Sequence, residues 1–401
     1  MNFANNFALS VFTGDIGFLI SIILHSNRNF ISLFNEYRRF KVSASGVRLN
    51  LYAPFLAPLL FCLDAERAHH IALTSLKLGL YPRYIKNHDP ILANKLWDLD
   101  FPSPVGVAAG FDKNAEVFDP LLKLGFGFVE TGTVTPLAQE GNDKPRMYRL
   151  PEDLGFINRL GFNNKGLRYF KRKLLSWHNQ GRNGIIGANI GKNKHAKDGV
   201  SDYVKGVKTL SEFVSYLVIN ISSPNTPKLR DLQSRDNLKI LLKAVTLARE
   251  ESIKHPPILL KIAPDLSDLE LGDIADVAIE AKIDGIIVSN TTIQRPNSLK
   301  DKKRNQEGGL SGEPLFELST KILREMYLLT GGQIPLIGVG GVASGIQAYE
   351  KIKAGASLVQ LYSAMVYRGP KIAHMIAEEL AFLLKKDGFN NITAAIGVDH
   401  A

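Results

Sequence analysis

The sequence predicts an α/β protein, a (β/α)8 TIM barrel with a small N-terminal helical domain that associates with a membrane. Three observations carry this prediction. Eight short apolar runs recur between residues 105 and 363, segments of helical periodicity lie between them, and a strongly apolar helical segment precedes the first run. Eight strands that alternate with helices favour a closed parallel barrel over an open doubly wound sheet.

Residues 1–50 are predicted to form an N-terminal extension that is either interfacial or disordered. The stretch from Ala8 to Leu24 is largely apolar, which would suit a membrane anchor, but Asp15 interrupts it. Neither apolar run beside Asp15 reaches the roughly 20 residues that a membrane-spanning helix requires. A transmembrane helix is therefore the less favoured alternative to an interfacial segment.

Residues 51–82 are predicted to form a domain of two short amphipathic helices. Apolar residues recur at helical spacing from Leu51 to Leu63, and the pattern resumes after Asp64, a residue type that caps helices. The first of these helices is unusually apolar. The pattern leaves two alternatives open, because the helices could pack on the main core or contact a membrane.

Residues 83–401 are predicted to form the barrel. The expected strands are VGVAA from Val105, GFVETGT from Gly127, IIGANI from Ile185, YLVINI from Tyr216, ILLKIA from Ile258, GIIVSN from Gly285, PLIGVG from Pro335 and LVQLYS from Leu358. Expected helices include residues 237–254, 266–281, 316–330 and 345–354. In this fold the catalytic groups gather at the carboxyl ends of the strands, so we expect the active site there.

Composition narrows the classes of partner. The net charge of +10 suits anionic partners such as phosphate cofactors, acidic lipids or nucleic acid. Nucleic acid is not expected, because the sequence has neither a zinc-finger spacing nor an RNP-like aromatic motif. The single cysteine, Cys62, excludes an internal disulfide and a cysteine-based metal cluster. No metal site is expected either, since the nine histidines are scattered.

The residues that follow the expected strands are mostly amides, hydroxyls, glycines and lysines. They are Gly110 and Lys113; Thr131 and Thr133; Asn189 and Lys192; Asn220, Ser223 and Asn225; Lys261; Ser289, Asn290 and Thr291; Gly340 and Gly341; and Tyr362 and Ser363. Loops are rich in Asn, Ser and Gly, which explains individual cases but not the scarcity of carboxylates and histidines. Such a set suits a polar, anionic ligand.

The last two expected strands indicate a phosphate site. The run GVGG from Gly338 ends the seventh strand, and Gly369 and Pro370 open a helix after the eighth. Backbone amides and helix N-termini in these places form the usual phosphate site of such barrels. A phosphate at this rim, with uncharged side chains across the barrel mouth, points to flavin mononucleotide (FMN). Lys261 would then stabilise negative charge at the pyrimidine side of the reduced ring.

A series of longer motifs occurs in order along the chain. They are AAGFDKNAE, FGFVETGTVTP, PRMYRLPED, INRLGFNNKG, NIGKNK, NISSPNTPKLRDLQ, KIAPDL, SNTT, GGLSGEPL, IGVGGV and LVQLYSA. Together they resemble class 2, quinone-dependent dihydroorotate dehydrogenase, from about Leu51 to the carboxyl end. The resemblance implies an FMN-dependent dihydroorotate:quinone oxidoreductase of pyrimidine biosynthesis, which converts dihydroorotate to orotate.

The resemblance also assigns the contacts. Residues matched to FMN binding are Ala109, Gly110, Phe111, Asp112, Lys113, Thr133, Asn189, Asn220, Lys261, Ser289, Gly312, Gly341, Tyr362 and Ser363. Residues matched to dihydroorotate binding are Lys113, Asn158, Arg159, Leu160, Gly161, Phe162, Asn220, Asn225, Asn290 and Thr291.

Ser223 matches the catalytic base of the family. Two prolines in NISSPNTP restrict the backbone, so that the hydroxyl is held at the carbon that loses a proton. Ser223 would take the C5 proton of dihydroorotate as hydride passes from C6 to flavin N5, with Lys113 stabilising the charge that develops on the substrate. In the alternative, Ser223 caps a turn and Ser222 is the reactive hydroxyl.

The resemblance implies membrane quinone as the oxidant. Relatives with soluble acceptors carry a cysteine in place of Ser223, whereas this sequence has no cysteine in a barrel loop. The helices of residues 51–82 would form an apolar tunnel to the flavin and rest on the membrane surface. The expected location is the cytoplasmic face of the bacterial inner membrane, with the mitochondrial inner membrane as the alternative. One rival function is that of another FMN barrel, acting on a different dihydropyrimidine or a tRNA uridine. The other is a flavin-binding or membrane-scaffold protein without turnover, which the presence of Ser223, Lys113 and both asparagines disfavours.

Overall fold

The computed structural model describes residue 52, residues 56–82 and residues 88–400. The chain divides into two compact units, Met1–Ala68 and His69–Ala401. The expected extension of residues 1–50 lies outside the described residues. The barrel belongs to the second unit.

The described part of the first unit is helical. Helix α3 spans Ala57–Phe61, and α4, Ala65–Lys77, begins in this unit. Asp64 caps α4 as the sequence predicts, because its Oδ1 accepts hydrogen bonds from the backbone amides of Glu66 at 3.0 Å and Arg67 at 3.1 Å. Among the described residues, no helix combines the length and hydropathy needed to cross a membrane.

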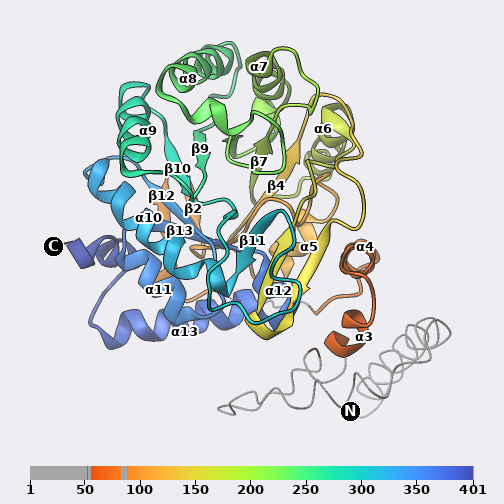
Figure 1. The fold of residues 1–401 in the computed structure, drawn as a ribbon. Helices are drawn as coiled ribbons and strands as arrows, with labels where there is room; N and C mark the ends of the chain where they lie inside the picture. Colours follow the sequence, from red (N-terminus) through yellow and green to blue (C-terminus); the bar gives the residue numbers. More distant parts are fainter. Residues whose placement is uncertain (1–51, 53–55, 83–87, 401) are drawn as a thin grey trace. The chain divides into compact units, whose positions relative to one another are not determined.

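The second unit contains a closed barrel of eight parallel strands, which follow one another around the ring in chain order (Figure 1). Its strands are β3 (Val105–Val107), β4 (Phe128–Val134), β7 (Ile185–Ile190), β8 (Tyr216–Asn220), β9 (Ile258–Ile262), β10 (Gly285–Val288), β12 (Leu336–Val339) and β13 (Ala356–Leu361). All eight expected strands are confirmed. Seven of them are buried along their whole length, and β7 is buried after its first residue, because helices cover the outer face and side chains fill the interior.

The outer helices surround this ring (Figure 1). They are α5 (Phe118–Lys123), α6 (Gly166–His178), α7 (Gly199–Leu210), α8 (Arg235–Glu250), α9 (Asp268–Glu280), α10 (Phe316–Leu329), α11 (Gly345–Lys353) and α13 (Ile372–Lys386), whereas α12 (Ser363–Arg368) lies at the carboxyl end of β13. Short polar residues start several of them. Ser267 and Glu270 form a capping box on α9, Asp198 caps α7 and Ser344 caps α11. Single 3-10 turns occupy Pro90–Leu92, Pro151–Asp153, Ser211–Phe213, Arg230–Gln233, Glu313–Leu315, Ile392–Ala395 and Val398–His400.

A hairpin that the sequence pattern did not predict packs aromatic side chains against the barrel interior. Strands β1 (Asn94–Leu96) and β2 (Leu99–Phe101) pair antiparallel. The Phe101 ring meets Phe128 of β4 edge to face, with 5.4 Å between centroids, and Trp97 Nε1 donates a hydrogen bond of 2.7 Å to the carbonyl of Asp284, next to β10. Bulky side chains therefore fill this end of the barrel, and the site lies at the other end.

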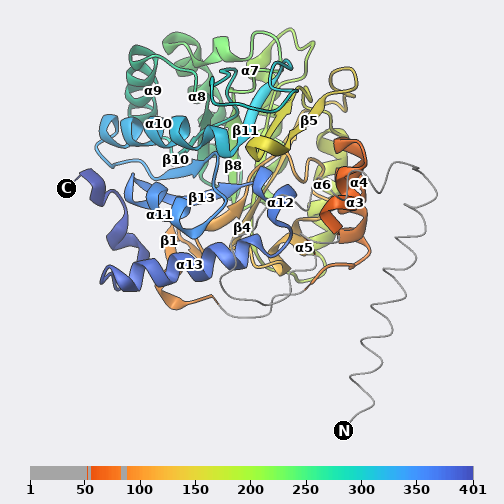
Figure 2. The same cartoon turned by 60° about the horizontal axis from the view of Figure 1, so that its bottom comes forward.

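A small antiparallel sheet joins two long loops of the barrel. Strands β5 (Met147–Leu150) and β6 (Gly155–Asn158) belong to the connection after β4, and β11 (Gly309–Gly312) belongs to the connection after β10. Strand β6 pairs with both neighbours, in the order β11-β6-β5, and the two outer strands, β11 and β5, are labelled in Figure 2. Segments about 150 positions apart in the sequence are thereby joined, and we call this element the cap sheet.

Candidate active site

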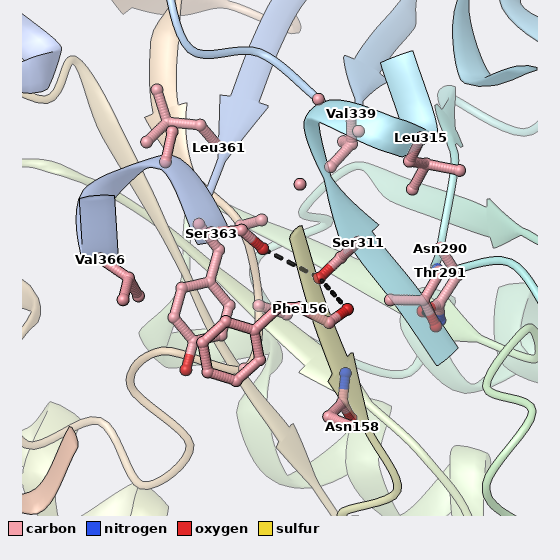
Figure 3. Close-up of a pocket in the computed structure, with 18 of the residues that line it drawn as sticks. Phe156, Asn158, Asn290, Thr291, Ser311, Leu315, Val339, Leu361, Ser363 and Val366 are labelled. Carbon is pink, nitrogen blue, oxygen red and sulfur yellow. Dashed lines mark hydrogen bonds between the residues drawn. The ribbon is translucent and has the colours of Figure 1, made fainter. Parts of the chain in front are cut away.

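A cavity lies between the carboxyl ends of the barrel strands and the cap sheet, and Figure 3 shows part of its lining. Strand ends and the segments that follow them contribute Ala108, Ala109, Gly110, Lys113, Thr133, Asn220, Ser223, Asn225, Lys261, Ser289, Asn290, Thr291, Val339, Gly340, Gly341, Val342, Ala343, Leu361, Tyr362, Ser363 and Ala364. Ser311 of the cap sheet ties the two sides together, because its Oγ lies 2.9 Å from Ser363 Oγ (Figure 3).

Most of the residues that the sequence assigns to the site line this cavity. Besides Ser223 they are Ala109, Gly110, Lys113, Thr133, Asn158, Leu160, Gly161, Phe162, Asn220, Asn225, Lys261, Ser289, Asn290, Thr291, Gly312, Gly341, Tyr362 and Ser363. Four assigned residues are not among those lining it: Phe111, Asp112, Arg159 and Asn189. Each of these four is engaged by protein groups beside the cavity.

Asp112 and Phe111 shape the loop after β3. The Asp112 carboxylate accepts hydrogen bonds from the backbone amides of Glu116 at 2.8 Å and Val117 at 2.7 Å. Its burial raises the pKa of Asp112 to about 6. The Phe111 ring packs edge to face against Tyr362, with 5.5 Å between centroids. Both side chains thus hold the loop that carries Lys113 to the cavity.

Arg159 points out of the cavity. Its guanidinium donates hydrogen bonds to the carbonyls of Pro145 at 2.9 Å and Glu307 at 3.3 Å, and to the Tyr148 hydroxyl at 2.6 Å. It joins the two long loops, so the assignment of its side chain to substrate binding is not supported by the geometry.

Three asparagines form a continuous hydrogen-bonded row across the strand ends. Asn220 Nδ2 donates to Asn189 Oδ1 at 3.0 Å, and Asn290 Nδ2 donates to Asn220 Oδ1 at 3.3 Å. Thr133 Oγ1 donates to Asn189 Oδ1 at 2.6 Å. Each amide is therefore fixed in one orientation, with Asn220 and Asn290 at the cavity and Asn189 behind them.

Ser222 and Ser223 occupy different environments. Ser222 is fully buried, and its Oγ donates to Asn220 Oδ1 at 3.1 Å and accepts from Asn290 Nδ2 at 3.0 Å. Ser223 lines the cavity, and its Oγ accepts a hydrogen bond of 3.3 Å from the backbone amide of Asn225. Of the two hydroxyls, Ser223 is the one placed to meet a ligand.

The segment that carries Ser223 is fixed on both sides. Arg230 Nε donates to the carbonyl of Ser222 at 3.1 Å, and Arg230 forms an ion pair of 3.0 Å with Asp265. Asn225 Nδ2 donates to the carbonyl of Asn158 in the cap sheet at 3.2 Å. The serine is consequently held between the barrel and the cap sheet.

The turn after β12 is built by glycine. Gly340 has φ of +108° and Gly341 has φ of +77°, a region that side chains with a Cβ rarely adopt. A Cβ at Gly341 would lie 2.5 Å from Phe316 Cβ and 2.7 Å from the Phe316 amide nitrogen. The backbone of this turn therefore lies against α10 while it borders the cavity.

Sequence reasoning missed the apolar part of the lining. It comprises Met147, Leu154, Phe156, Leu315, Val366 and Tyr367, mostly from the cap sheet and α12. The quoted motifs PRMYRLPED and GGLSGEPL contain two of these six positions, Met147 and Leu315, but these apolar residues gave no signal that they would face a ligand rather than a core.

Glu116 links three segments beside the loop after β3. It accepts hydrogen bonds from Lys77 of α4 at 2.7 Å, Lys165 at 2.8 Å and Tyr169 of α6 at 2.5 Å. Partial burial opposes ionisation of Glu116, but these donors outweigh it and lower the pKa of Glu116 to about 2.

Glu116→Gln is expected to reduce the free energy of unfolding by about 1–2 kcal/mol at pH 7, an amount kept small by solvent screening. The pKa of Glu116 is lower in the folded protein than its ordinary value of 4.5, so its stabilising effect is present above pH 4.5 and is lost as the pH falls towards 2. Urea unfolding of both proteins at pH 7 and pH 3 measures this. A difference that stays constant between the two pH values would contradict the assignment.

Comparison with known proteins identifies the family. A model of the family described as dihydroorotate dehydrogenase matches residues 91–384. The chain belongs to the dihydroorotate dehydrogenase family. It is 51% identical over 355 residues to dihydroorotate dehydrogenase (quinone) of Azorhizobium caulinodans, covering 88% of this chain and 99% of that protein.

Eukaryotic members of the dihydroorotate dehydrogenase family are also similar. The mitochondrial dihydroorotate dehydrogenase (quinone) of Mus musculus is 49% identical over 359 residues, covering 88% of this chain and 91% of that protein. The solved structure of ligand-free DHODH from Eimeria tenella has a TM-score of 0.82 at 45% identity, covering 84% of this chain and all of that chain.

The cavity of this family member suits FMN in three respects. The glycine turn after β12 brings backbone close to the rim, where a phosphate is expected. Thr133, Asn220 and Lys261 offer a hydroxyl, an amide and an ammonium group to a pyrimidine edge. The apolar lining offers contact to the opposite edge of a flat ring system.

Proposed function

We propose that this chain oxidises dihydroorotate to orotate with bound FMN and passes the electrons to a membrane quinone. The support is the family membership together with the cavity, where a glycine turn, a fixed row of amides, Lys113, Lys261 and Ser223 converge. FMN supplies the hydride acceptor and returns two electrons to the quinone. In the balanced reaction dihydroorotate loses a proton and a hydride, and the quinone gains two electrons and two protons.

Ser223 is proposed as the general base. Its hydroxyl accepts the substrate's C5 proton and releases one proton to solvent. A neutral hydroxyl is a weak base, so the site must compensate for it. The fixed position between the barrel and the cap sheet keeps Ser223 aligned, and the ammonium of Lys113 stabilises charge that develops on the substrate.

The side of the cavity near α4 is proposed as the quinone side. His69 lies edge to face with Phe111, with 5.1 Å between centroids, and its ring centroid is 6.1 Å from that of Tyr362, which lines the cavity. Burial, followed by the positive charge of Lys113, lowers the pKa of His69 to about 3. The imidazole is therefore neutral at physiological pH, and with Phe111 it forms an uncharged aromatic group beside Tyr362, an environment that suits a quinone ring.

Peripheral attachment to a membrane follows from the choice of quinone, which is dissolved in the bilayer. Leu78 and Leu80, which follow the end of α4, are 68% and 45% exposed. Such apolar side chains at the surface suit contact with lipid. We favour the cytoplasmic face of a bacterial inner membrane, with the mitochondrial inner membrane as the alternative.

An anaerobic titration tests the proposed function. The purified protein is expected to be yellow, to lose its flavin absorbance when dihydroorotate is added, and to regain it when a short-chain quinone follows. Dihydrouracil, a closely related compound that lacks the carboxylate, serves as the control and should leave the absorbance unchanged. An unchanged spectrum with dihydroorotate would contradict the substrate, and no recovery with quinone would contradict the acceptor.

A further inference from the structure

A fully buried carboxylate occupies the interior of the barrel beneath the cavity. Glu130, in the middle of β4, is 0% exposed. Three side chains from three other strands donate hydrogen bonds to it: Asn189 Nδ2 at 2.8 Å, Gln360 Nε2 at 2.7 Å and Lys261 Nζ at 3.3 Å. Nothing in the proposed mechanism uses this carboxylate, although its surroundings are built around it.

Glu130 is directly connected to the groups that face the ligand. Lys261 lines the cavity and forms a buried ion pair with Glu130. Asn189 carries the connection further, because its Oδ1 accepts hydrogen bonds from Thr133 and Asn220, which also line the cavity. A change at Glu130 would therefore affect the residues that line the cavity in two ways. It would alter the charge balance at Lys261 and the position of the Asn189 side-chain amide.

Stability alone is a weak reason for such a pair. Removing a carboxylate and an ammonium from water costs several kcal/mol for each ion, and their attraction commonly no more than balances that cost. The negative charge also acts on its neighbours. Burial, followed by the charge of Glu130, raises the pKa of Tyr216 well above its ordinary value and keeps that phenol neutral.

We propose that Glu130 is a positioning residue that sets the reduction potential of the bound flavin by balancing the charge of Lys261. This inference rests on the proposed function, since it assumes that FMN occupies the cavity. A flavin that accepts hydride gains negative charge, which a lone ammonium beside the pyrimidine edge would stabilise strongly. The ion pair with Glu130 weakens that stabilisation, so that the electrons remain available to the quinone.

Glu130→Gln tests this charge balance with little change of shape. Gln360 Oε1, a buried oxygen that has no hydrogen-bond partner among the described residues, can accept from the new amide after rotation of the Gln360 side chain. The variant is expected to raise the midpoint potential of bound FMN, measured against reference dyes. We expect affinity for reduced over oxidised FMN to rise roughly tenfold or more, equivalent to about 30 mV for a two-electron couple.

The matched control is Glu280→Gln. Glu280 forms an ion pair of 2.7 Å with Lys239, and the two side chains are 62% and 40% exposed. Glu280→Gln thus removes a carboxylate from an ion pair with a lysine, as Glu130→Gln does, but on the outer surface. The midpoint potential of the bound flavin should not change. Equal potentials in wild type, Glu130→Gln and Glu280→Gln would overturn the proposal, even if Glu130→Gln unfolds more easily.

A second pair of variants covers the case in which Glu130→Gln retains no flavin. Lys261→Met should lower the potential, because it leaves the carboxylate unbalanced, whereas Glu130→Gln with Lys261→Met should return it towards the wild-type value. A double variant that matches Lys261→Met would overturn the proposal. The dye titration needs no dihydroorotate, so a wrong substrate assignment would leave this test intact.

Discussion

Ser223→Ala is expected to slow reduction of the bound flavin by dihydroorotate about 100-fold to 10,000-fold, the usual contribution of a positioned general base. FMN and orotate should still bind with nearly wild-type affinity, because among the described residues the Ser223 side chain accepts a single hydrogen bond, from the backbone amide of Asn225. Anaerobic stopped-flow spectroscopy measures the reduction rate, and equilibrium titration with orotate measures the affinity.

Ser222→Ala is the comparison for this variant. Its hydroxyl holds Asn220 and Asn290 at 3.1 Å and 3.0 Å, so its loss should weaken dihydroorotate binding more than it slows the reaction of the bound substrate. The opposite pattern, with fast reduction in Ser223→Ala and slow reduction in Ser222→Ala, would transfer the role of base to Ser222.

Gly341→Ala is expected to yield a protein that purifies largely without flavin. The new Cβ would approach Phe316 to 2.5 Å, and φ of +77° costs a residue with a Cβ roughly 1–2 kcal/mol. The turn must move away from α10, and the backbone that borders the cavity moves with it. We expect the dissociation constant for FMN to increase roughly 100-fold, equivalent to about 2.8 kcal/mol, measured by fluorescence on adding FMN to the apoprotein.

Gly272→Ala provides the matched control for this substitution. Gly272 lies in α9, its φ is not in the left-handed region, and a Cβ there would meet no atom within 4 Å. Alanine should therefore stabilise the helix by about 0.5–1 kcal/mol and leave FMN affinity unchanged. Unaltered FMN affinity in Gly341→Ala would show that the turn does not hold the cofactor.

The barrel itself is largely predictable from the sequence. Each barrel strand is a run of apolar residues bounded by loop residues, and buried parallel strands are recognised by that signal. The hairpin β1–β2 was missed because each strand has three residues, too few to show a period. The cap sheet was missed because β6 pairs with β11 about 150 positions away, and no local pattern reveals such a partner.

The site was predictable where residues follow strands. Ser223, Asn225, Asn290 and Thr291 lie after strand ends and line the cavity as expected. The position of a residue in the chain does not reveal where its side chain points. The motif that contains Arg159 was assigned to substrate binding, but the Arg159 guanidinium contacts Pro145 and Tyr148 instead. Glu130 was missed because a carboxylate in the middle of a strand resembles an ordinary exposed position until the barrel closes around it.

The cap sheet has a consequence for access. It has three strands of four residues each, against eight strands in the ring, and small units of this kind can open at a lower free-energy cost than the domain that carries them. We expect dihydroorotate to enter and orotate to leave through brief separation of β6 and β11, while the ring stays closed. The barrel would therefore stay rigid throughout the catalytic cycle, and local opening would be confined to the cap sheet.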